Sequence, residues 1–203
     1  RYVAQARPAI LAGQQTDDLF VTMETGSKLI VGGNLQFKGV RDRNMQVELV
    51  GASTLQLGGS LLRQNSPSKY GKLVMSSTAT IVLNGTVSQL LDGNTGNTDH
   101  NNFTNVIVRN TSDSSPQVQL TGDVTITNAL TMEDGDIATT ADYTLTLTNT
   151  SATALSGYSA NSYIVGNFRQ YITKNTSTYA FPLGYGGPNQ YYWAKIVNNN
   201  MEG

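Results

Sequence analysis

A short motif recurs at a constant spacing along this chain, and this periodicity constrains the fold more than any other feature. The pattern is apolar, any residue, apolar, any residue, glycine, polar, apolar, and the first three copies span residues 29–35, 55–61 and 81–87. The glycine recurs at a step of 26 residues in these copies. A fixed period in this range is typical of repeat architectures, in which each unit buries its apolar face only by stacking on a neighbour.

Later copies of the motif break the regular step. A fourth copy spans 118–124, with its glycine 37 residues after that of the third, and a degenerate copy at 145–149 ends in Asn149. We interpret the longer step as an insertion of about eleven residues, which costs little in loop-closure entropy. The polar, turn-rich stretch 91–102 is its predicted place. We expect the repeated glycines to supply a positive φ at one corner of each coil: Gly33, Gly59, Gly85 and Gly122.

Each unit contains up to three short segments in which apolar residues alternate with others. Eight residues before the motif, a second alternating pair recurs in register, as at Val21 and Met23 and again at Val47 and Leu49. Alternation with a period of two predicts half-buried strands. The sequence therefore predicts an all-β fold, a parallel β-solenoid with three short strands per 26-residue coil.

Two other β architectures explain the pattern less well. A left-handed hexapeptide solenoid needs six-residue steps around each coil, which the sequence does not contain, and a wider, right-handed coil fits 26 residues better. An antiparallel β-sandwich also has short alternating strands. The unbroken register over three copies favours the solenoid. We expect a lead-in or cap over 1–18, solenoid repeats over 19–156, about five coils, and a β-rich cap or the start of a following β module over 157–203.

The composition narrows the function classes. The 203 residues carry a net charge of −1, and 13% are charged, so the surface offers no electrostatic case for nucleic acid or an anionic membrane. No segment has the apolar length of a membrane span, and we expect no membrane insertion. There is no cysteine, which excludes disulfides and thiolate metal sites. Nothing in the sequence calls for a cofactor.

Several longer stretches resemble one group of proteins. Asn84–Gln89 reads NGTVSQ, Phe103–Val108 reads FTNVIV, and Leu120–Thr131 reads LTGDVTITNALT; the similarity continues through 132–147, and 162–169 with 178–184 resembles the segment that commonly follows the solenoid. These stretches resemble the β-helical repeat regions of large secreted, adhesin-like surface proteins of Bacteroidota. The resemblance implies a cell-surface or extracellular location and export by the type IX secretion route. We therefore expect the chain to be part of a longer exported polypeptide.

Few residues carry recognisable chemistry. The single histidine, His100, lies in the predicted insertion without a nucleophile signature nearby, and we interpret it as a solvated loop residue. Asp92, Asn94 and Asp99 share that loop and resemble oxygen-rich calcium ligands, although the EF-hand order is absent. Turn formation by Asx residues is the alternative interpretation, so no metal site is predicted beyond these weak candidates.

Two further patterns have a structural and a functional interpretation. The acids Glu133, Asp134 and Asp136 contain a possible carboxylate pair for glycoside hydrolysis, but Asp134-Gly135 is first a turn signal. The Thr-x-Thr rows at 125–127 and 144–148 form no regular array, because other residue types fill equivalent slots, so a solvated strand face explains them better than ice binding. We predict no catalytic residues and no enzymatic activity.

Aromatic residues gather after residue 157. Clustered aromatics stack on sugars or anchor partner proteins, and they also form the core of a β cap. We name four as weak candidates for ligand or partner contact: Tyr185, Tyr191, Tyr192 and Trp193.

The leading prediction is a non-enzymatic stalk, adhesive or filament-forming segment of an exported cell-surface protein. Its expected partners are other domains of the same polypeptide, further copies of itself in filaments, a surface glycan or another cell. The alternative is a carbohydrate-binding or polysaccharide-degrading β-helix.

Overall fold

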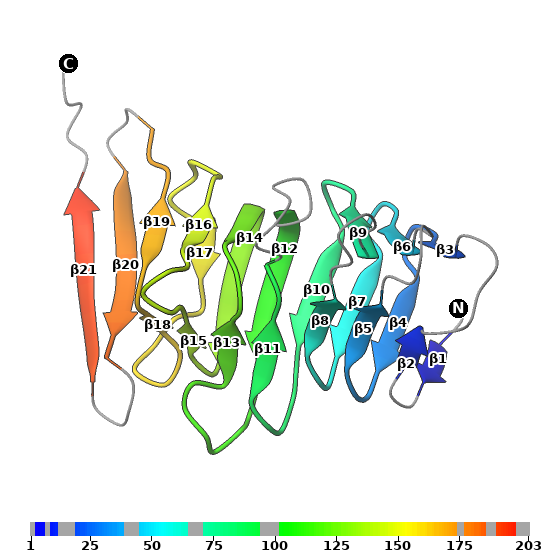
Figure 1. Ribbon diagram of the computed structural model, residues 1–203. Helices are drawn as coiled ribbons and strands as arrows, with labels where there is room; N and C mark the ends of the chain where they lie inside the picture. Colours follow the sequence, from blue (N-terminus) through cyan, green and yellow to red (C-terminus); the bar gives the residue numbers. More distant parts are fainter. Residues whose placement is uncertain are drawn as a thin grey trace.

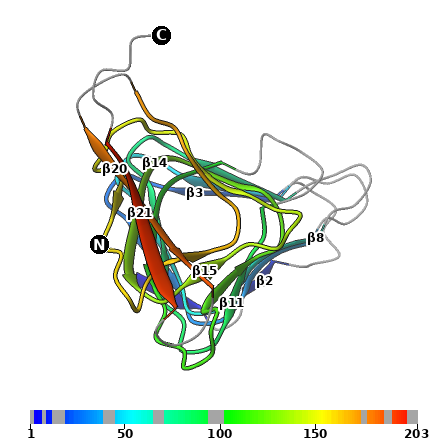
Figure 2. The same ribbon diagram turned by 90° about the vertical axis from the view of Figure 1, so that its left-hand side faces the viewer.

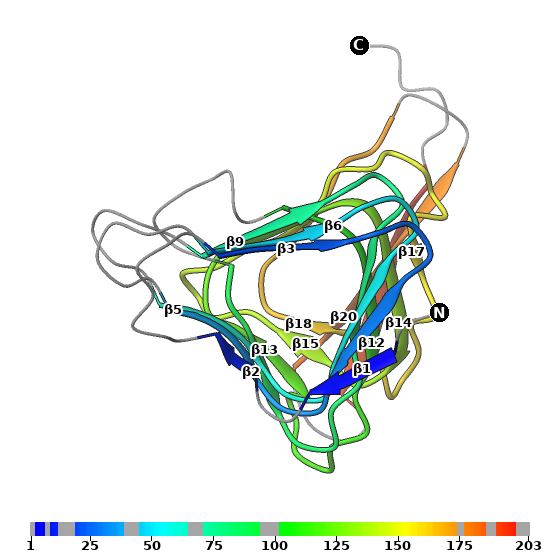
Figure 3. The ribbon, with the colours of Figure 1, turned by 90° about the vertical axis from the view of Figure 1, so that its right-hand side faces the viewer.

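The chain winds its short strands into a stack of successive coils (Figure 1). The computed structural model describes residues 3–6, 9–11, 19–38, 45–64, 71–93, 102–173, 177–185 and 190–197. Within these ranges the chain forms strands and turns but no helix. Viewed along the stack, the coils superpose as a ring with three sides (Figure 3). The predicted parallel β-solenoid of roughly 26-residue coils with three strands per turn is therefore confirmed.

Each side of the ring is a ladder of parallel strands. The first side contains β1 (Val3–Ala6), β4 (Lys28–Val31), β7 (Thr54–Leu57), β10 (Thr80–Leu83) and β12 (Asn102–Arg109). The second contains β2 (Ala9–Leu11), β5 (Leu35–Lys38), β8 (Leu61–Gln64), β11 (Gln89–Leu91), β13 (Val118–Leu120), β15 (Ile137–Ala138), β18 (Ile164–Val165) and β20 (Thr178–Gly184). The third begins with β3 (Leu19–Met23), β6 (Met45–Leu49) and β9 (Gly71–Met75).

In the later coils the third and first sides merge into one sheet. The long strand β14 (Val124–Asp134) pairs through its first residues with β16 (Leu145–Leu147) and through later ones with β17 (Leu155–Ser156). A register irregularity between β12 and β14, at Phe103–Asn105, marks the place where earlier coils turn the corner from the third side to the first. The sheet then ends at β19 (Phe168–Gln170), which pairs with β16.

The register of the first three repeats matches the sequence prediction. Leu29, Leu55 and Ile81 are successive partners in the first ladder, and Val21, Val47 and Leu73 in the third. Equivalent residues therefore stack at the strand spacing of about 4.8 Å. Their alternation places one set of side chains toward the axis of the coil.

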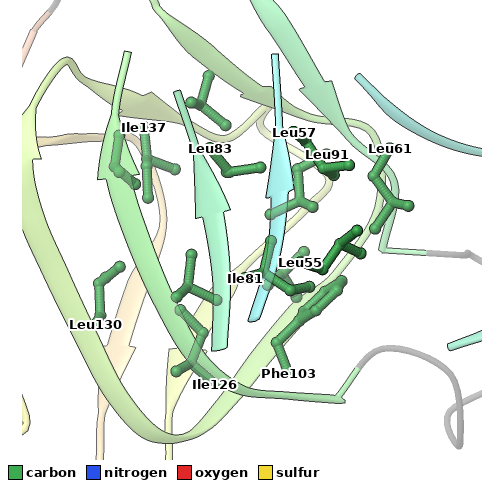
Figure 4. Packing of buried hydrophobic residues seen from close by; sticks show 14 of the residues in the cluster. Leu55, Leu57, Leu61, Ile81, Leu83, Leu91, Phe103, Ile126, Leu130 and Ile137 are labelled. Carbon is green, nitrogen blue, oxygen red and sulfur yellow. The ribbon is translucent and has the colours of Figure 1, made fainter. Parts of the chain in front are cut away.

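The apolar slots form one continuous core along the axis, as predicted. The close-up in Figure 4 shows leucines and isoleucines of successive strands pointing into the same interior. The fully buried side chains include Leu55, Leu57, Leu61, Ile81, Leu83, Leu91, Phe103 and Leu120. Burying a side chain of this size contributes about 1.5–3 kcal/mol, and no single coil encloses such a core.

The fourth motif copy does not occupy the predicted position. Val118 pairs with Gln89 on the second side, whereas the partner of Ile81 is Val106, a step of 25 residues. The register interpretation of the 37-residue step was therefore wrong, because strand-plus-corner patterns occur on every side of a coil. The corner between β12 and β13 runs over 110–117 and is longer than the corners at 32–34 and 58–60. Of the predicted insertion, residues 94–101 lie outside the described ranges. Val87, placed in the third apolar slot by the sequence pattern, is 62% exposed.

The repeated glycines lie at corners between strands, but the predicted reason for them was wrong. Positive φ occurs at Gly26, Gly51, Gly135, Gly157 and Gly166. Gly59 has no positive φ; a Cβ there would lie 2.4 Å from the carbonyl carbon of Gly33. At Gly85 a Cβ would lie 2.9 Å from the carbonyl oxygen of Gly58. Glycine is required there because successive coils approach closely. Gly122, assigned to the same column, follows β13 and lies at the next corner.

Both ends carry strands of the same ladders. β1 and β2 pair in parallel with β4 and β5, so described residues of 1–18 extend the stack. At the other end β20 pairs with β18 and is followed by β21 (Tyr191–Val197), which is antiparallel to it. Figure 2 shows β20 and β21 along one side of the terminal coil.

Candidate functional site

A polar cavity lies at the corner between the first and second sides. Its volume is about 370 Å³, and the loop 110–117 forms one wall. The opposite wall comes from the corner after β14 and from residues 160–163 of the next coil. The lining residues are Thr111, Ser112, Asp113, Ser115, Gln117, Asp134, Asp136, Ala160, Asn161 and Tyr163.

Side chains within the loop hold its shape. The Asn110 Oδ1 atom accepts a hydrogen bond from the Ser112 backbone N–H at 2.8 Å, and Ser112 Oγ accepts one from the Ser114 N–H at 3.1 Å. Gln117 Nε2 donates to the Ser112 carbonyl at 3.1 Å, while its Oε1 accepts from the Asp136 N–H at 2.8 Å. These local bonds replace the strand pairing that the loop lacks.

Asp136 is the most constrained acid of the corner. Its carboxylate accepts hydrogen bonds from the Tyr163 N–H at 3.2 Å and from the Ser115 hydroxyl at 3.2 Å. Burial raises the pKa of the Asp136 carboxyl, and these hydrogen bonds oppose the shift. Of the three acids singled out in the sequence, Asp134 and Asp136 line the cavity, whereas Glu133 is ion-paired with Arg109 on the surface.

The Asp136 geometry predicts a pH effect on stability. A carboxyl whose pKa is raised in the folded state binds protons more tightly when folded, so its contribution to stability is lost as pH rises through the folded-state pKa. Asp136→Asn removes this titration and keeps an acceptor for the Tyr163 N–H. We expect the free energy of unfolding of the variant, relative to the native chain, to be higher at pH 7 than at pH 4. Urea unfolding at both pH values tests this, and an unchanged difference would contradict it.

Asp92, the one described member of the predicted calcium loop, makes a hydrogen bond to the backbone of the preceding coil. Its Oδ2 atom accepts a hydrogen bond from the Arg63 backbone N–H at 2.9 Å. The buried Arg63 guanidinium lies 5.6 Å from the centre of the Phe103 ring; burial lowers the pKa of Arg63 to about 10, and the charge of Asp92 opposes that shift. Asn94, Asp99 and His100 lie outside the described residues. Among those described, no three His, Cys, Asp or Glu side chains form a metal-binding group.

Sequence reasoning missed a buried amide network in the same corner. The fully buried Gln89 side chain accepts from the Gly85 N–H at 3.0 Å and donates to the Leu57 carbonyl at 3.0 Å and to the Gly59 carbonyl. Asn110 Nδ2 donates to Gln89 Oε1 at 2.9 Å. Three successive coils are thus joined through one side chain, and the corner backbone groups are satisfied.

A ladder of asparagines on the outside was also missed, since aligning the repeats shows no constant outward polar residue. Asn128 Nδ2 donates to Asn105 Oδ1 at 2.7 Å, and Asn149 Nδ2 donates to the Asn128 carbonyl at 2.9 Å. Asn105 Nδ2 donates to the Ala79 carbonyl at 2.8 Å. These residues recur at steps of 23 and 21, which a search for a 26-residue period does not detect.

We expect Asn128→Ala to lower the free energy of unfolding by about 1 kcal/mol, because the ladder loses its middle member where water partly replaces it. Asn102→Ala is the matched control, an exposed asparagine at the start of β12, and its expected change is within about 0.5 kcal/mol. Equal effects of the two substitutions in urea unfolding would argue against a stabilising ladder.

The four aromatic candidates differ in their surroundings. The Tyr191 ring lies 5.8 Å from that of Tyr163, the tyrosine that lines the polar corner cavity. Tyr185 is 83% exposed and lines a second cavity of about 380 Å³ on the far side of Ser115. Tyr192 and Trp193 are exposed on β21, where Lys195 Nζ lies 4.8 Å from the Trp193 ring centre. Tyr185 thus lies at the edge of a cavity, and the other three candidates lie on β21.

The predicted threonine rows extend over only two neighbouring strands, β14 and β16. Thr125 and Thr146 are partners in the ladder, but their neighbours on either side are Asn102 and Arg169. No flat threonine array extends over these coils.

The stacked parallel strands define the chain as a β-solenoid protein. No protein-family model matches it, and no curated protein or solved structure does so either. Within the described ranges, no helix has the length and apolarity that crossing a membrane requires.

Proposed function

We propose that the chain is a structural segment, a stalk or adhesive spacer, of an exported cell-surface protein, and that it acts without catalysis. The observation that carries this proposal is the single apolar core that runs along the stack from Met23 to Ile164. A core shared by all coils couples each coil to the next, so that separating any two exposes buried apolar surface and breaks a parallel ladder. Such a rod transmits force along its axis and holds a distal domain away from a surface.

Two further features support a spacer. Hydrogen bonds from side chains, such as those of Gln89 and Asn128, run between coils in addition to the ladders. The surface of low charge density, with 13% charged residues, suits display more than electrostatic capture of a ligand. The resemblance to Bacteroidota adhesin-like proteins supports an extracellular location, type IX export and attachment to other domains of one polypeptide.

Location and mechanics are tested separately. Antibodies against the chain are expected to label intact cells of the source organism before permeabilisation; labelling only afterwards would refute export.

In single-molecule pulling with handles at residues 24 and 161, we expect resistance to extension that falls when Gln89 is replaced. A chain that extends without a resisting barrier would refute the stalk.

Carbohydrate binding is the second candidate, favoured by the two cavities that flank Ser115. One is lined by carboxylates and amides, and the other by exposed Tyr185, an arrangement of polar groups beside an aromatic platform that suits a sugar. A glycan array with the native chain, Tyr185→Ala, Asp134→Asn and Trp193→Ala tests it. Saturable binding lost in Tyr185→Ala or Asp134→Asn would support this alternative. Turnover of a polysaccharide, lost in Asp134→Asn, would refute a purely structural role.

A further inference from the structure

β21 is an edge strand that carries large, exposed apolar side chains. β21 contacts β20 on one edge only, and in the described residues no strand lies against its other edge. Its apolar side chains project on both faces, with exposed fractions of 69% for Tyr192, 53% for Trp193, 40% for Ile196 and 53% for Val197. A long, apolar, unpaired edge is the feature that other strands recognise, and natural sheets normally cover or charge it.

The pairing with β20 determines which backbone groups of β21 face outward. The Tyr185 N–H donates to the Gln190 carbonyl, so residues 185 and 190 are a hydrogen-bonded pair. Hydrogen-bonded and non-hydrogen-bonded pairs alternate along an antiparallel ladder. The pair of Leu183 with Tyr192 is therefore hydrogen-bonded, and that of Pro182 with Trp193 is not, in agreement with the missing proline N–H. The N–H and C=O groups of residues 191, 193, 195 and 197 point to the free edge.

This alternation leaves few ways for two β21 strands to pair in antiparallel order. Pairing centred on Lys195 places two ammonium groups opposite each other, which is destabilising. Pairing centred on Trp193 leaves the outward groups of Val197 without a partner in the strand. Pairing centred on Ala194 uses all four outward residues and places Trp193 opposite Lys195, a contact the two already make within one chain at 4.8 Å. It also places Tyr191 opposite Val197 and Tyr192 opposite Ile196.

We propose that β21 is a self-association edge, through which two copies of this chain pair in antiparallel order about a twofold axis at Ala194. The aromatic half of each strand meets the aliphatic half of the other, so the surface is complementary to itself. The pairing joins two rods edge to edge along β21 and closes after two copies. It goes beyond the spacer role and does not depend on it.

Size-exclusion chromatography with light scattering tests the association. We expect the native chain to have twice its mass of 21.8 kDa at high concentration. Lys195→Pro removes an outward N–H without breaking a bond to β20, and it should raise the dissociation constant by about tenfold or more. Lys195→Thr keeps that N–H and is the matched control, with an expected change of under about threefold. A native chain that stays monomeric, or equal effects of the two variants, would overturn the proposal.

A single cysteine tests the register, because the chain has none of its own. At the twofold axis the two Ala194 Cα atoms would lie about 4.5 Å apart, within the range for a disulfide. Ala194→Cys is therefore expected to form a disulfide-linked dimer on mild oxidation. Ile196→Cys, on the same face but opposite Tyr192 of the partner, is expected to cross-link at least about tenfold more slowly. Faster linkage at position 196 than at 194, or linked species larger than a dimer, would overturn the assignment.

Discussion

Gly59→Ala is expected to lower the free energy of unfolding by about 3 kcal/mol and the Tm by roughly 10 °C. The added Cβ would lie 2.4 Å from the Gly33 carbonyl carbon and 2.6 Å from the Asn34 nitrogen. Both atoms are backbone of the preceding coil, so no rotamer change relieves the contact. The corner must separate, which weakens the hydrogen bond from the Gly59 N–H to the Gly33 carbonyl, now 3.0 Å. Thermal and urea unfolding followed by circular dichroism measure the change.

Two other glycines provide controls. A Cβ on Gly32 meets nothing within 4 Å and its φ is not positive, so Gly32→Ala is expected to be neutral or to stabilise by about 0.5 kcal/mol. A Cβ on Gly26 is also free of contacts, but its φ is +76°, and Gly26→Ala is expected to cost about 1 kcal/mol. Close approach is the wrong explanation for the repeated glycine if Gly59→Ala costs no more than Gly26→Ala.

The regular part of the fold was predictable from the sequence because stacking repeats the same demand in each coil. Leu29, Leu55 and Ile81 occupy the same position in successive coils and face one core, so apolar character recurs at a fixed step. The close contact of neighbouring corners likewise recurs as glycine at Gly33 and Gly59. A conformational reason and a packing reason select the same residue there, and only the structure distinguishes them.

The predicted register failed at the corner where another residue type stands in place of the repeated glycine. The residue four after Val106, which corresponds to Gly85 after Ile81, is Asn110. Its side chain fills the corner with hydrogen bonds to the Val87 carbonyl at 2.9 Å and to Gln89. An asparagine in place of glycine hides the repeat, and the similar pattern at 118–124 then attracts the alignment. The polar corner groups were unpredictable for the same reason, since each coil uses a different residue type.

The second large effect concerns that polar corner. We expect Gln89→Met, which keeps the volume of the side chain, to lower the free energy of unfolding by about 4 kcal/mol. The substitution leaves the Gly85 N–H and the Gly59 carbonyl without their partner in a site that water does not reach. The Leu57 carbonyl loses its bond from Gln89 but keeps the one from the Asn84 N–H at 2.9 Å. Each buried polar group left unsatisfied costs about 1–3 kcal/mol. Urea unfolding gives the loss as a lower midpoint with an unchanged slope.

Gln56→Met is the matched control for this substitution. Gln56 is half-buried on the outer face of β7, and its ladder partners are Ile30 and Val82, so a methionine there gains apolar neighbours. Its expected change is within about 0.5 kcal/mol. If Gln89→Met is as mild as Gln56→Met, the corner carbonyls must find other donors, and the amide would not be what joins the three coils. If it alone is severe, one side chain that no repeat pattern reveals contributes as much to the stack as a core leucine.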